Sequence, residues 1–364
     1  MKKIGLDIRE FKKGRMTGIG RFIKNFIVYA CEIKKDWEFL LFGNQDTLIP
    51  FDLPNNSNVK IIAEGNTQIW EQIKLPLFLH KIKCDLFFSP YYKTPILTNI
   101  PSVITIHDLI HLTYPDYNKS FYLEKQLSKI YSAKASAIIT DSENSKKDIV
   151  KILKVNAEKI FVIYNAIDTS FFNPERNSND FENIAKKYSI KKPYLLYVGN
   201  SKPHKNVNKI YQAYKLLPKS LKVKYMLVLS GVGDYDYPIC LDKDSLSVIP
   251  RVEEEEIALL YSNASLFVFP SFYEGFGFPP LEAMACGCPV ISSNASCMPE
   301  ILGDSCLYFN PDDSKNIAKI MDIALTDKSL RFSLTKKGLE QVKKYAPEKV
   351  VNNILGVFEK IKQF

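Results

Sequence analysis

Short apolar runs alternate with amphipathic segments along the whole sequence, and no other feature limits the possible folds as strongly. Runs of about 4 to 8 apolar residues are typical of strands buried on both faces, whereas apolar residues at every third or fourth position are typical of helices. The alternation predicts an α/β protein in which helices cover parallel sheets. The expected strands are Ile4–Ile8, Phe39–Phe42, Asp85–Ser89, Val103–His107, Ala137–Asp141, Ile160–Tyr164, Tyr194–Val198, Met226–Ser230, Ser247–Ile249, Leu266–Phe269, Val290–Ser292 and Leu307–Phe309.

The strand series is interrupted near Asn173-Pro174 by a polar stretch. Asn and Pro favour turns, so we expect a linker there. The chain of 364 residues is also about two to three times as long as a typical domain. We predict one Rossmann-like domain over residues 1–173, a second over residues 174–346, and a final amphipathic helix within residues 347–364.

Composition argues against several classes of protein. Apolar residues make up 46% of the sequence and charged residues 24%, which is typical of a folded protein rather than a disordered or fibrous one. The seven cysteines include no C-x-x-C pair, so the sequence supports neither a disulfide framework nor a zinc site and fits a reducing cytoplasm. No apolar run approaches the roughly 20 residues that span a bilayer, and Met1-Lys2-Lys3 leads into a strand rather than a signal sequence. We therefore expect a cytoplasmic location.

The net charge of +9 suits anionic partners such as nucleotides, phospholipid headgroups or nucleic acid. The lysines are scattered and no DNA- or RNA-binding module is visible, so we expect no nucleic-acid partner. Two segments, residues 70–83 and 119–134, combine lysines with apolar residues at helical spacing. Each segment is either a peripheral contact with an anionic membrane or a core-packed helix with a solvated edge of lysines, and the sequence leaves both interpretations open.

Loops that follow strands are the first places to search for a site, because ligands of parallel sheets bind outside the carboxyl ends of the strands. The first such loop contains Gly18 and Gly20 and opens a helix, so its backbone N–H groups can contact a phosphate. The alternative is a turn that needs glycine. The loop has the first two glycines of G-x-G-x-x-G and lacks the third, which argues against a dinucleotide-dependent hydrogen-transfer enzyme.

Polar residues also follow two other expected strands. His107 and Asp108 come after the fourth strand of the first half, where an imidazole serves either acid–base chemistry or structural hydrogen bonding. The first strand of the second half is followed by Gly199, Lys202 and Lys205. Fixed cations at a helix N-terminus would neutralise a departing diphosphate, and a solvated basic loop is the alternative interpretation.

The densest signal is the segment from Phe269 to Gly287. A buried-strand pattern leads into a loop of glycines and aromatic residues, and Pro279-Pro280 then begins a helix. Glu274 lies in this loop, and we expect Glu282 in the first turn of the helix. Carboxylates accept hydrogen bonds from sugar hydroxyls, and loop amides can hold a phosphate or a hexose. A helix-capping role is the alternative for Glu282.

At this point the chain resembles the retaining glycosyltransferases of the GT-B fold, in particular glycosyltransferase family 4. Glu274 and Glu282 match the E-x7-E signature of that family, and four other landmarks occur in the expected order. These landmarks are TGIGRF at Thr17–Phe22, IHDL at Ile106–Leu109, NAID at Asn165–Asp168 and YVGNSKPHKN at Tyr197–Asn206. The chain is most similar to bacterial mannosyltransferases that build O-antigen, capsule or other envelope glycans. The resemblance implies two Rossmann-like domains that face each other across a cleft, with the last helix crossing back to the first domain.

The resemblance also implies roles for individual residues. The second domain would bind a nucleotide sugar, with Glu282 on the ribose, Glu274 on the transferred sugar and Lys205 on the diphosphate. His107 of the acceptor-binding first domain would lie beside the sugar and the acceptor. The other implied donor-binding residues are Gly18, Gly199, Asn200, Lys202, Arg251, Val252, Gly275, Phe276, Gly277 and Phe278. Asn200 is a departure, since many relatives have arginine at this position, and Lys202 would supply the missing charge.

The resemblance implies front-face displacement through an oxocarbenium-like state, with GDP-mannose favoured as donor over a UDP- or dTDP-sugar. The acceptor would be a glycan or a glycan linked to polyprenyl diphosphate. We expect no metal or other cofactor, because the acidic strings Asp234-Tyr235-Asp236 and Asp242-Lys243-Asp244 are interpreted as solvated turns rather than metal sites. A non-catalytic nucleotide- or nucleic-acid-binding protein is the remaining alternative.

Overall fold

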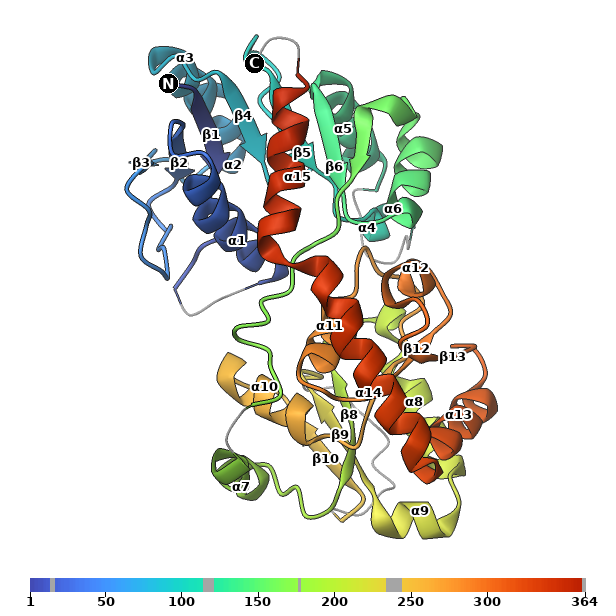
Figure 1. The fold of residues 1–364 in the computed structure, drawn as a ribbon. Coiled ribbons are helices and arrows are strands. Elements are labelled where there is room, and N and C mark those ends of the chain that lie inside the picture. Colours follow the sequence, from blue (N-terminus) through green and yellow to red (C-terminus); the bar gives the residue numbers. More distant parts are fainter. Residues whose placement is uncertain (14–16, 114–120, 176–177, 234–243, 362–364) are drawn as a thin grey trace. The chain divides into compact units, whose positions relative to one another are not determined.

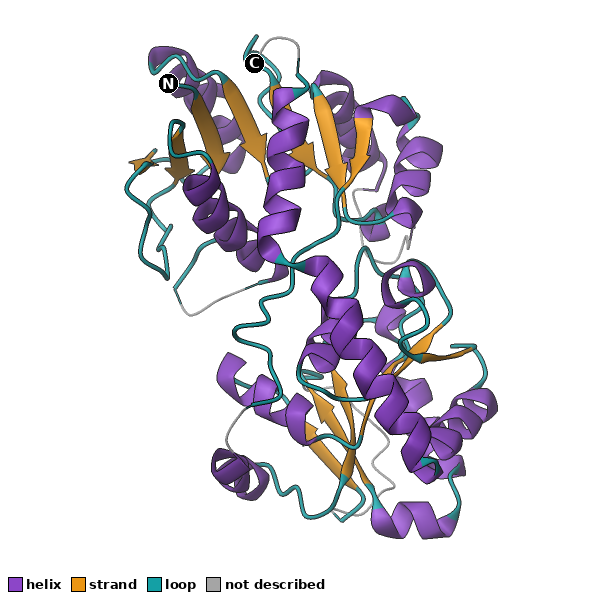
Figure 2. Ribbon diagram, in the orientation of Figure 1, coloured by secondary structure: helices purple, strands orange, loops and turns teal. Residues whose placement is uncertain are grey.

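The computed structural model describes residues 1–13, 17–113, 121–175, 178–233 and 244–361. The chain forms two compact units, and each is a parallel sheet covered by helices (Figures 1 and 2). The first unit comprises Met1–Ala166 together with Pro347–Phe364, and the second comprises Ile167–Ala346. The predicted α/β architecture with two Rossmann-like sheets is therefore confirmed.

The first unit contains a seven-stranded parallel sheet in the order β3-β2-β1-β4-β5-β6-β7. Its strands are β1 (Lys3–Asp7), β2 (Glu38–Gly43), β3 (Ser57–Ile61), β4 (Leu86–Ser89), β5 (Ser102–Thr105), β6 (Ala137–Thr140) and β7 (Ile160–Val162). The inner strands β4, β5 and β6 are buried along their whole length, which explains their continuous apolar runs. Edge strand β3 was missed in the sequence, because its residues are half-buried or exposed and form no such run.

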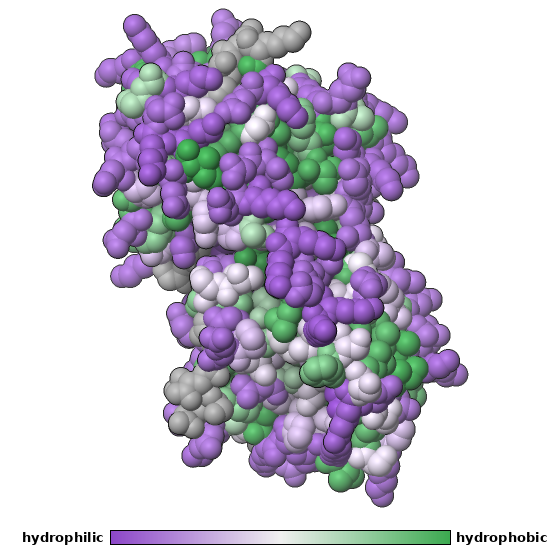
Figure 3. Space-filling model, in the orientation of Figure 1, coloured by the Kyte–Doolittle hydropathy of each residue, from purple (hydrophilic) through white to green (hydrophobic). Residues whose placement is uncertain are grey.

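Helices cover both faces of this sheet. One face packs against α1 (Gly18–Ile33) and the C-terminal α15 (Pro347–Glu359), which lie in front of the sheet in Figure 1. The Phe26 ring of α1 and the Phe358 ring of α15 lie 5.8 Å apart, so the last helix does return to the first unit. Hydrophilic side chains cover most of the visible surface of this face (Figure 3).

The opposite face of the first sheet is covered by a second set of helices, and two separate apolar clusters lie beneath them. These helices are α2 (Thr67–Ile69), α3 (Leu75–Lys81), α4 (Ile110–Thr113), α5 (Phe121–Lys134) and α6 (Glu143–Asp148). Three further turns complete the face: the π-helical turns Trp70–Lys74 and Ile149–Leu153 and the 3₁₀ turn Ala157–Lys159. Residues 67–81 form one continuous helical segment, since α2, the π turn and α3 follow each other without a break.

The second unit contains a six-stranded parallel sheet in the order β10-β9-β8-β11-β12-β13. Its strands are β8 (Tyr194–Val198), β9 (Met226–Ser230), β10 (Leu246–Ile249), β11 (Leu266–Phe269), β12 (Val290–Ser293) and β13 (Leu307–Phe309). All six were expected within a residue or two of their observed bounds.

The helices of the second unit surround its sheet. They are α7 (Ser178–Lys187), α8 (Val207–Leu216), α9 (Lys219–Lys224), α10 (Glu254–Asn263), α11 (Phe278–Ala285), α12 (Met298–Leu302), α13 (Ser314–Thr326) and α14 (Lys328–Val342), with 3₁₀ turns at Pro203–Lys205 and Lys343–Tyr345. The apolar faces of α8 and α13 pack on one side of the sheet. On α10, the Tyr261 ring meets Phe267 of β11 at 5.4 Å. The loops after β8, β10 and β11 therefore emerge at one edge of this sheet, as its parallel order requires.

Candidate active site

Lys205 and Glu274 form an ion pair in the second unit. Lys205 Nζ lies 2.7 Å from Glu274 Oε1 and 2.9 Å from Oε2, so the ammonium group donates to both carboxylate oxygens. The two side chains are only 15% and 12% exposed. The two residues belong to separate loops that the sequence assigns to the site, and the structure brings them into direct contact.

The loop that carries Lys205 is fixed by its backbone geometry. Gly199 has φ +153°, and a Cβ added there would lie 2.7 Å from Tyr197 Oη, which donates to the carbonyl oxygen of Asn200. Asn206 adopts the left-handed conformation with φ +55°, which is uncommon for a residue other than glycine. Its buried Nδ2 donates to the carbonyl oxygens of Pro270 and Pro311. Asn206 thus ties the loop after β8 to the loop after β11, and it holds Lys205 opposite Glu274.

The loop that carries Glu274 is held by the residues that precede α12. The Glu274 N–H donates to Ser296 Oγ at 3.3 Å, and this hydroxyl donates back to the Glu274 carbonyl oxygen at 2.9 Å. Cys297 Sγ also donates to that oxygen. In the sequence Asn206 stands only as the last residue of the Tyr197–Asn206 landmark, and Ser296 and Cys297 belong to no pattern. The roles of all three depend on contacts between segments distant in the chain.

The glycine-aromatic loop is packed mainly through its side chains. Gly275, Phe276 and Gly277 are buried, and the Phe276 ring contacts the rings of Phe278 and Tyr345 at 5.2 and 5.4 Å. Gly277 has φ +94° immediately before α11. The phenyl rings are therefore engaged within the protein, and the backbone of Gly275–Phe278 is the part with the chemistry to bind a ligand.

Glu282 lies past the first turn of α11, since that helix begins at Phe278. The expectation of a first-turn position is wrong, and a carboxylate at this place does not cap the helix. Glu282 is 4% exposed, and its Oε2 accepts a hydrogen bond from Tyr261 Oη at 3.1 Å. Tyr261 of α10 thus orients the Glu282 carboxylate.

The remaining predicted residues of the second unit lie on loops at the same sheet edge. Asn200 and Lys202 are exposed, and the Lys202 N–H donates to Asn200 Oδ1. Arg251 is exposed and Val252 half-buried directly after β10. His204 is buried, and this burial lowers its pKa to about 4 against the raising effect of Glu274. His204 is therefore neutral near pH 7, so the positive charge beside Glu274 comes from Lys205.

His107 of the first unit is held on both sides of its ring. Its Nδ1 lies 2.8 Å from Asp141 Oδ2, its Nε2 lies 3.2 Å from the Pro90 carbonyl oxygen, and the Phe22 ring meets it edge-on at 5.4 Å. Burial opposes protonation, but Asp141, together with Asp108 and the Pro90 carbonyl, outweighs it, so the pKa of His107 is raised. Asp141 was not identified from the sequence as a site residue, although it ends an expected strand.

Gly18 begins α1 and is exposed. The preceding Thr17 caps the helix, because its Oγ1 accepts from the Gly20 N–H at 3.0 Å and donates to Glu10 Oε1 at 2.6 Å. Phe22, which contacts His107, lies one turn further along the same helix. The structure thus places Gly18 and His107 in one neighbourhood of the first unit.

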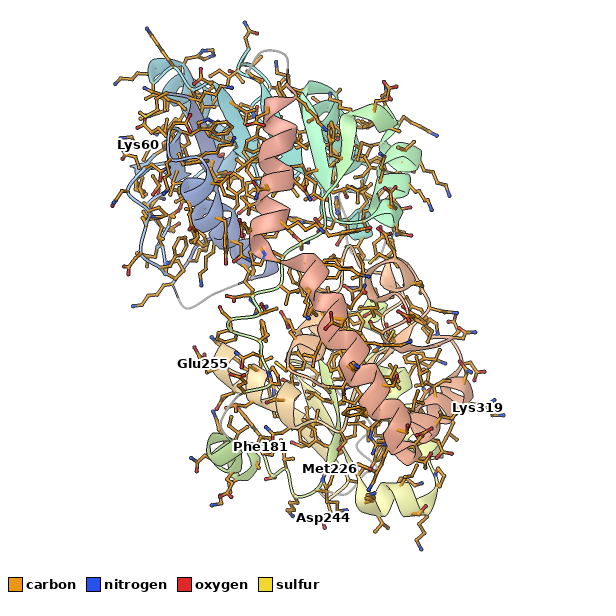
Figure 4. All side chains as sticks on the ribbon, viewed as in Figure 1. Lys60, Phe181, Met226, Asp244, Glu255 and Lys319 are labelled. Carbon is orange, nitrogen blue, oxygen red and sulfur yellow. The ribbon has the colours of Figure 1, made fainter. Side chains whose placement is uncertain are left out.

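Among the described residues there is no group of three or more His, Cys, Asp or Glu side chains with the arrangement of a metal site. Asp244, labelled in Figure 4, pairs with Lys191 at 2.7 Å and precedes β10, so it lies at the amino edge of the sheet. Asp234-Tyr235-Asp236, Asp242 and Lys243 lie outside the described residues.

Within the part of the chain that the structure describes, no helix has the length and apolar character needed to cross a membrane.

Comparison with known proteins shows the family and the fold of this chain. Residues 54–171 match the glycosyltransferase family 4 model, and residues 180–341 match the model of glycosyl transferases group 1. O-antigen chain mannosyltransferase B of Escherichia coli is 32% identical over 94% of this chain and 96% of that protein. O-antigen chain mannosyltransferase RfbU of Salmonella typhimurium is 35% identical over 64% of this chain and 62% of that protein. The crystal structure of Anabaena HepE in complex with UDP-glucose superposes with a TM-score of 0.74 and 16% identity over 99% of this chain and 100% of that one, a likeness of fold.

Proposed function

The chain belongs to the family 4 and group 1 glycosyltransferases, and from this membership we propose that it transfers mannose from GDP-mannose to a glycan acceptor in envelope polysaccharide synthesis. The names of the two O-antigen mannosyltransferases support both the sugar and the process. The acceptor is a glycan or a glycan on polyprenyl diphosphate. A UDP- or dTDP-sugar is the alternative donor.

The observation that carries the proposal is the partly buried ion pair of Lys205 and Glu274. Without a ligand, each charge compensates the other. A bound nucleotide sugar offers each group a new partner, because the diphosphate is an anion and the sugar hydroxyls are hydrogen-bond donors. We infer that Lys205 turns to the diphosphate while Glu274 accepts hydrogen bonds from the hexose. The exchange costs little, since neither charge is left buried and unpaired.

The proposed roles of these residues follow from the negative charge that develops on the leaving diphosphate during transfer. As the bond between the anomeric carbon and the diphosphate oxygen breaks, negative charge grows on the leaving group, and Lys205 stabilises it together with the Gly275–Phe278 amides. The acceptor hydroxyl forms the new bond on the same face of the sugar and passes its proton to the departing diphosphate. The anomeric configuration is retained. Glu274 orients the sugar, and Lys205 supplies positive charge that a metal ion would otherwise place on the diphosphate.

Measurement of donor binding tests the proposed function most directly. Thermal unfolding is measured with GDP-mannose, UDP-glucose and dTDP-rhamnose, because a ligand at 100 times its Kd stabilises a protein by about 2.7 kcal/mol. We expect GDP-mannose to give the largest shift, and we expect that shift to disappear in Lys205→Ala. A larger shift with a uridine or thymidine donor would replace the proposed donor. No shift with any nucleotide sugar would contradict the proposed function.

A further inference from the structure

The imidazole of His107 is held from three sides, and two of its three supports belong to segments outside β6. Asp141 follows β6 directly and lies 2.8 Å from Nδ1. The Pro90 carbonyl oxygen lies 3.2 Å from Nε2 and belongs to the loop after β4, and the Phe22 ring belongs to α1. The residues that fix this loop and this helix therefore also fix the orientation of the imidazole.

The loop after β4 is anchored on both sides of Pro90. The preceding Ser89 ends β4, and its Oγ accepts from the Tyr91 N–H at 3.3 Å. The Tyr91 carbonyl oxygen accepts at 3.2 Å from the N–H of Thr105, which ends β5. The side chain of Tyr91 adds a further anchor, because its hydroxyl donates to Glu10 Oε2 at 3.1 Å. Tyr91 thus holds the backbone that presents the Pro90 carbonyl oxygen to the imidazole.

The Glu10 carboxylate also supports the start of α1. Its Oε1 accepts a hydrogen bond from Thr17 Oγ1 at 2.6 Å, and Thr17 caps the helix by accepting from the Gly20 N–H at 3.0 Å. Negative charge is favourable near a helix N-terminus, so this carboxylate suits its place. Phe22 follows shortly after the cap and is buried. The second oxygen of Glu10 therefore fixes the helix that brings the Phe22 ring to the imidazole.

The Tyr91 phenol is protonated and acts as the donor to Glu10. Burial raises the pKa of Tyr91 well above its ordinary value, and the carboxylates of Asp7 and Glu10 raise it further. Glu10 thus accepts hydrogen bonds from two hydroxyl groups at once, one on each oxygen. A carboxylate has two acceptor oxygens, whereas the amide of glutamine has one. Replacement of Glu10 by glutamine therefore keeps the shape of the side chain and removes one of its two acceptors.

We propose that Glu10 is a positioning residue for His107. One carboxylate oxygen holds the loop after β4 and the other holds the N-terminus of α1, so a single side chain fixes two of the three supports of the imidazole. Glu10 differs in this from Asp141 and Asp108, which act on the imidazole through their charge. A carboxylate that served folding alone would have no effect on the titration of His107 in a folded protein.

The first measurement is an NMR titration of the ring protons of His107, which needs no substrate. The chain has four histidines, and His107→Gln assigns the signal. Purified full-length protein is compared with Tyr91→Phe, Glu10→Gln and Glu10→Ala. We expect the pKa of His107 to fall by about 0.5 or more in Glu10→Ala, because a displaced Pro90 carbonyl no longer accepts from the imidazolium. Glu10→Gln should lie between the parent and Glu10→Ala, because its amide oxygen still accepts from one hydroxyl.

Tyr214→Phe is the matched control for the loss of a tyrosine hydrogen bond. Tyr214 is buried in the second unit, and its hydroxyl donates to the Tyr225 carbonyl oxygen at 2.7 Å. We expect this variant to unfold at a lower temperature and to keep the parental titration of His107. Circular dichroism and thermal unfolding verify that every variant is folded at the temperature of the titration.

Turnover gives the second measurement, and this step rests on the proposed glycosyl transfer. We expect Glu10→Ala to lower kcat at least about tenfold, because a small displacement of a positioned group slows a reaction strongly. Tyr91→Phe should also lower kcat, and its donor KM should stay within about twofold of the parental value, since the change leaves the cap of α1 intact. Tyr214→Phe should keep the parental kcat.

The two measurements separate this inference from the proposed function. A parent without transferase activity would contradict the proposed function, and the titration of His107 would then decide the inference by itself. The proposal would be overturned by an unchanged titration in both Glu10→Ala and Tyr91→Phe, or by an equal change in Tyr214→Phe. A parental kcat in both folded variants of an active enzyme would overturn it as well.

Discussion

His107 and Asp141 lie 2.8 Å apart, and the second ring nitrogen of His107 faces the carbonyl oxygen of Pro90. Both ring nitrogens therefore face hydrogen-bond acceptors. A neutral imidazole donates to one acceptor, whereas an imidazolium donates to both. The arrangement favours the charged ring, in agreement with the raised pKa of His107. Asp141 thus orients the imidazole and favours its protonated form.

Asp141→Asn should lower the pKa of His107, because the neutral amide no longer stabilises the imidazolium. The proton signals of the ring report this pKa directly in an NMR titration. Since the folded-state pKa is raised, the stabilising contribution of the pair is fully present below the unfolded pKa and is lost as the pH rises through the folded pKa. The variant should therefore lose more unfolding free energy at about pH 5.5 than at about pH 9. An unchanged His107 titration would show that Asp141 does not hold the charge.

Lys205→Ala and Glu274→Ala should each reduce turnover at least about 100-fold, comparable with the loss of one donor to a developing oxyanion. Lys205→Ala removes charge from the leaving group, and Glu274→Ala removes the orientation of the sugar. Turnover is measured by release of the nucleoside diphosphate. Lys319→Ala is the matched control, because Lys319 is an exposed lysine on α13 of the same unit (Figure 4). Activity near that of the parent in both folded site variants would reject the assignment.

Gly231→Ala should disturb the loop after β8, which carries Lys205. Gly231 has φ +83°, and an added Cβ would lie 2.9 Å from the backbone oxygen of Gly199, which is the first residue after β8. The left-handed conformation alone should cost alanine about 1–2 kcal/mol of unfolding free energy, and the clash should raise the total loss to about 3 kcal/mol. We also expect the KM for the donor to rise. Gly233→Ala isolates the steric part, because Gly233 also has positive φ but has open space around its Cβ position. Equal effects of the two changes on stability would contradict the clash.

Chelation with EDTA should leave turnover unchanged, because Lys205 supplies the positive charge at the diphosphate. The measurement compares initial rates of protein that has been dialysed against EDTA, with and without added Mn²⁺ or Mg²⁺. Loss of activity on chelation and recovery with Mn²⁺ would show that a metal assists the leaving group.

The sequence predicted the parts of the fold that depend on local patterns. Buried strands such as β5 and β11 form continuous apolar runs, and parallel order then fixes which loops share an edge. Edge strand β3 has no such run and was missed. Glu282 lies just past the first turn rather than within it, because α11 begins at Phe278, one residue before the two prolines.

The supporting residues of the site were beyond sequence reasoning for a different reason. Asn206, Ser296 and Asp141 act through hydrogen bonds to segments between 22 and 105 residues away, and such pairings leave no spacing pattern in the chain. Periodicity also could not decide which side of residues 67–81 is buried. An apolar residue on a helix looks the same in the sequence whether it faces the core or the solvent, and only the sheet beneath it settles the question.

Packing of α15 against α1 and β4 has a consequence for biosynthesis. Phe358 contacts both Phe26 and Phe88, so the core of the first unit includes residues that the ribosome adds more than 250 positions later. The first unit begins to leave the ribosome before the second, but its chain is completed after the second. During translation the core of the first unit lacks α15 until the end, whereas the second unit, Ile167–Ala346, is contiguous and has all of its residues before that helix is made.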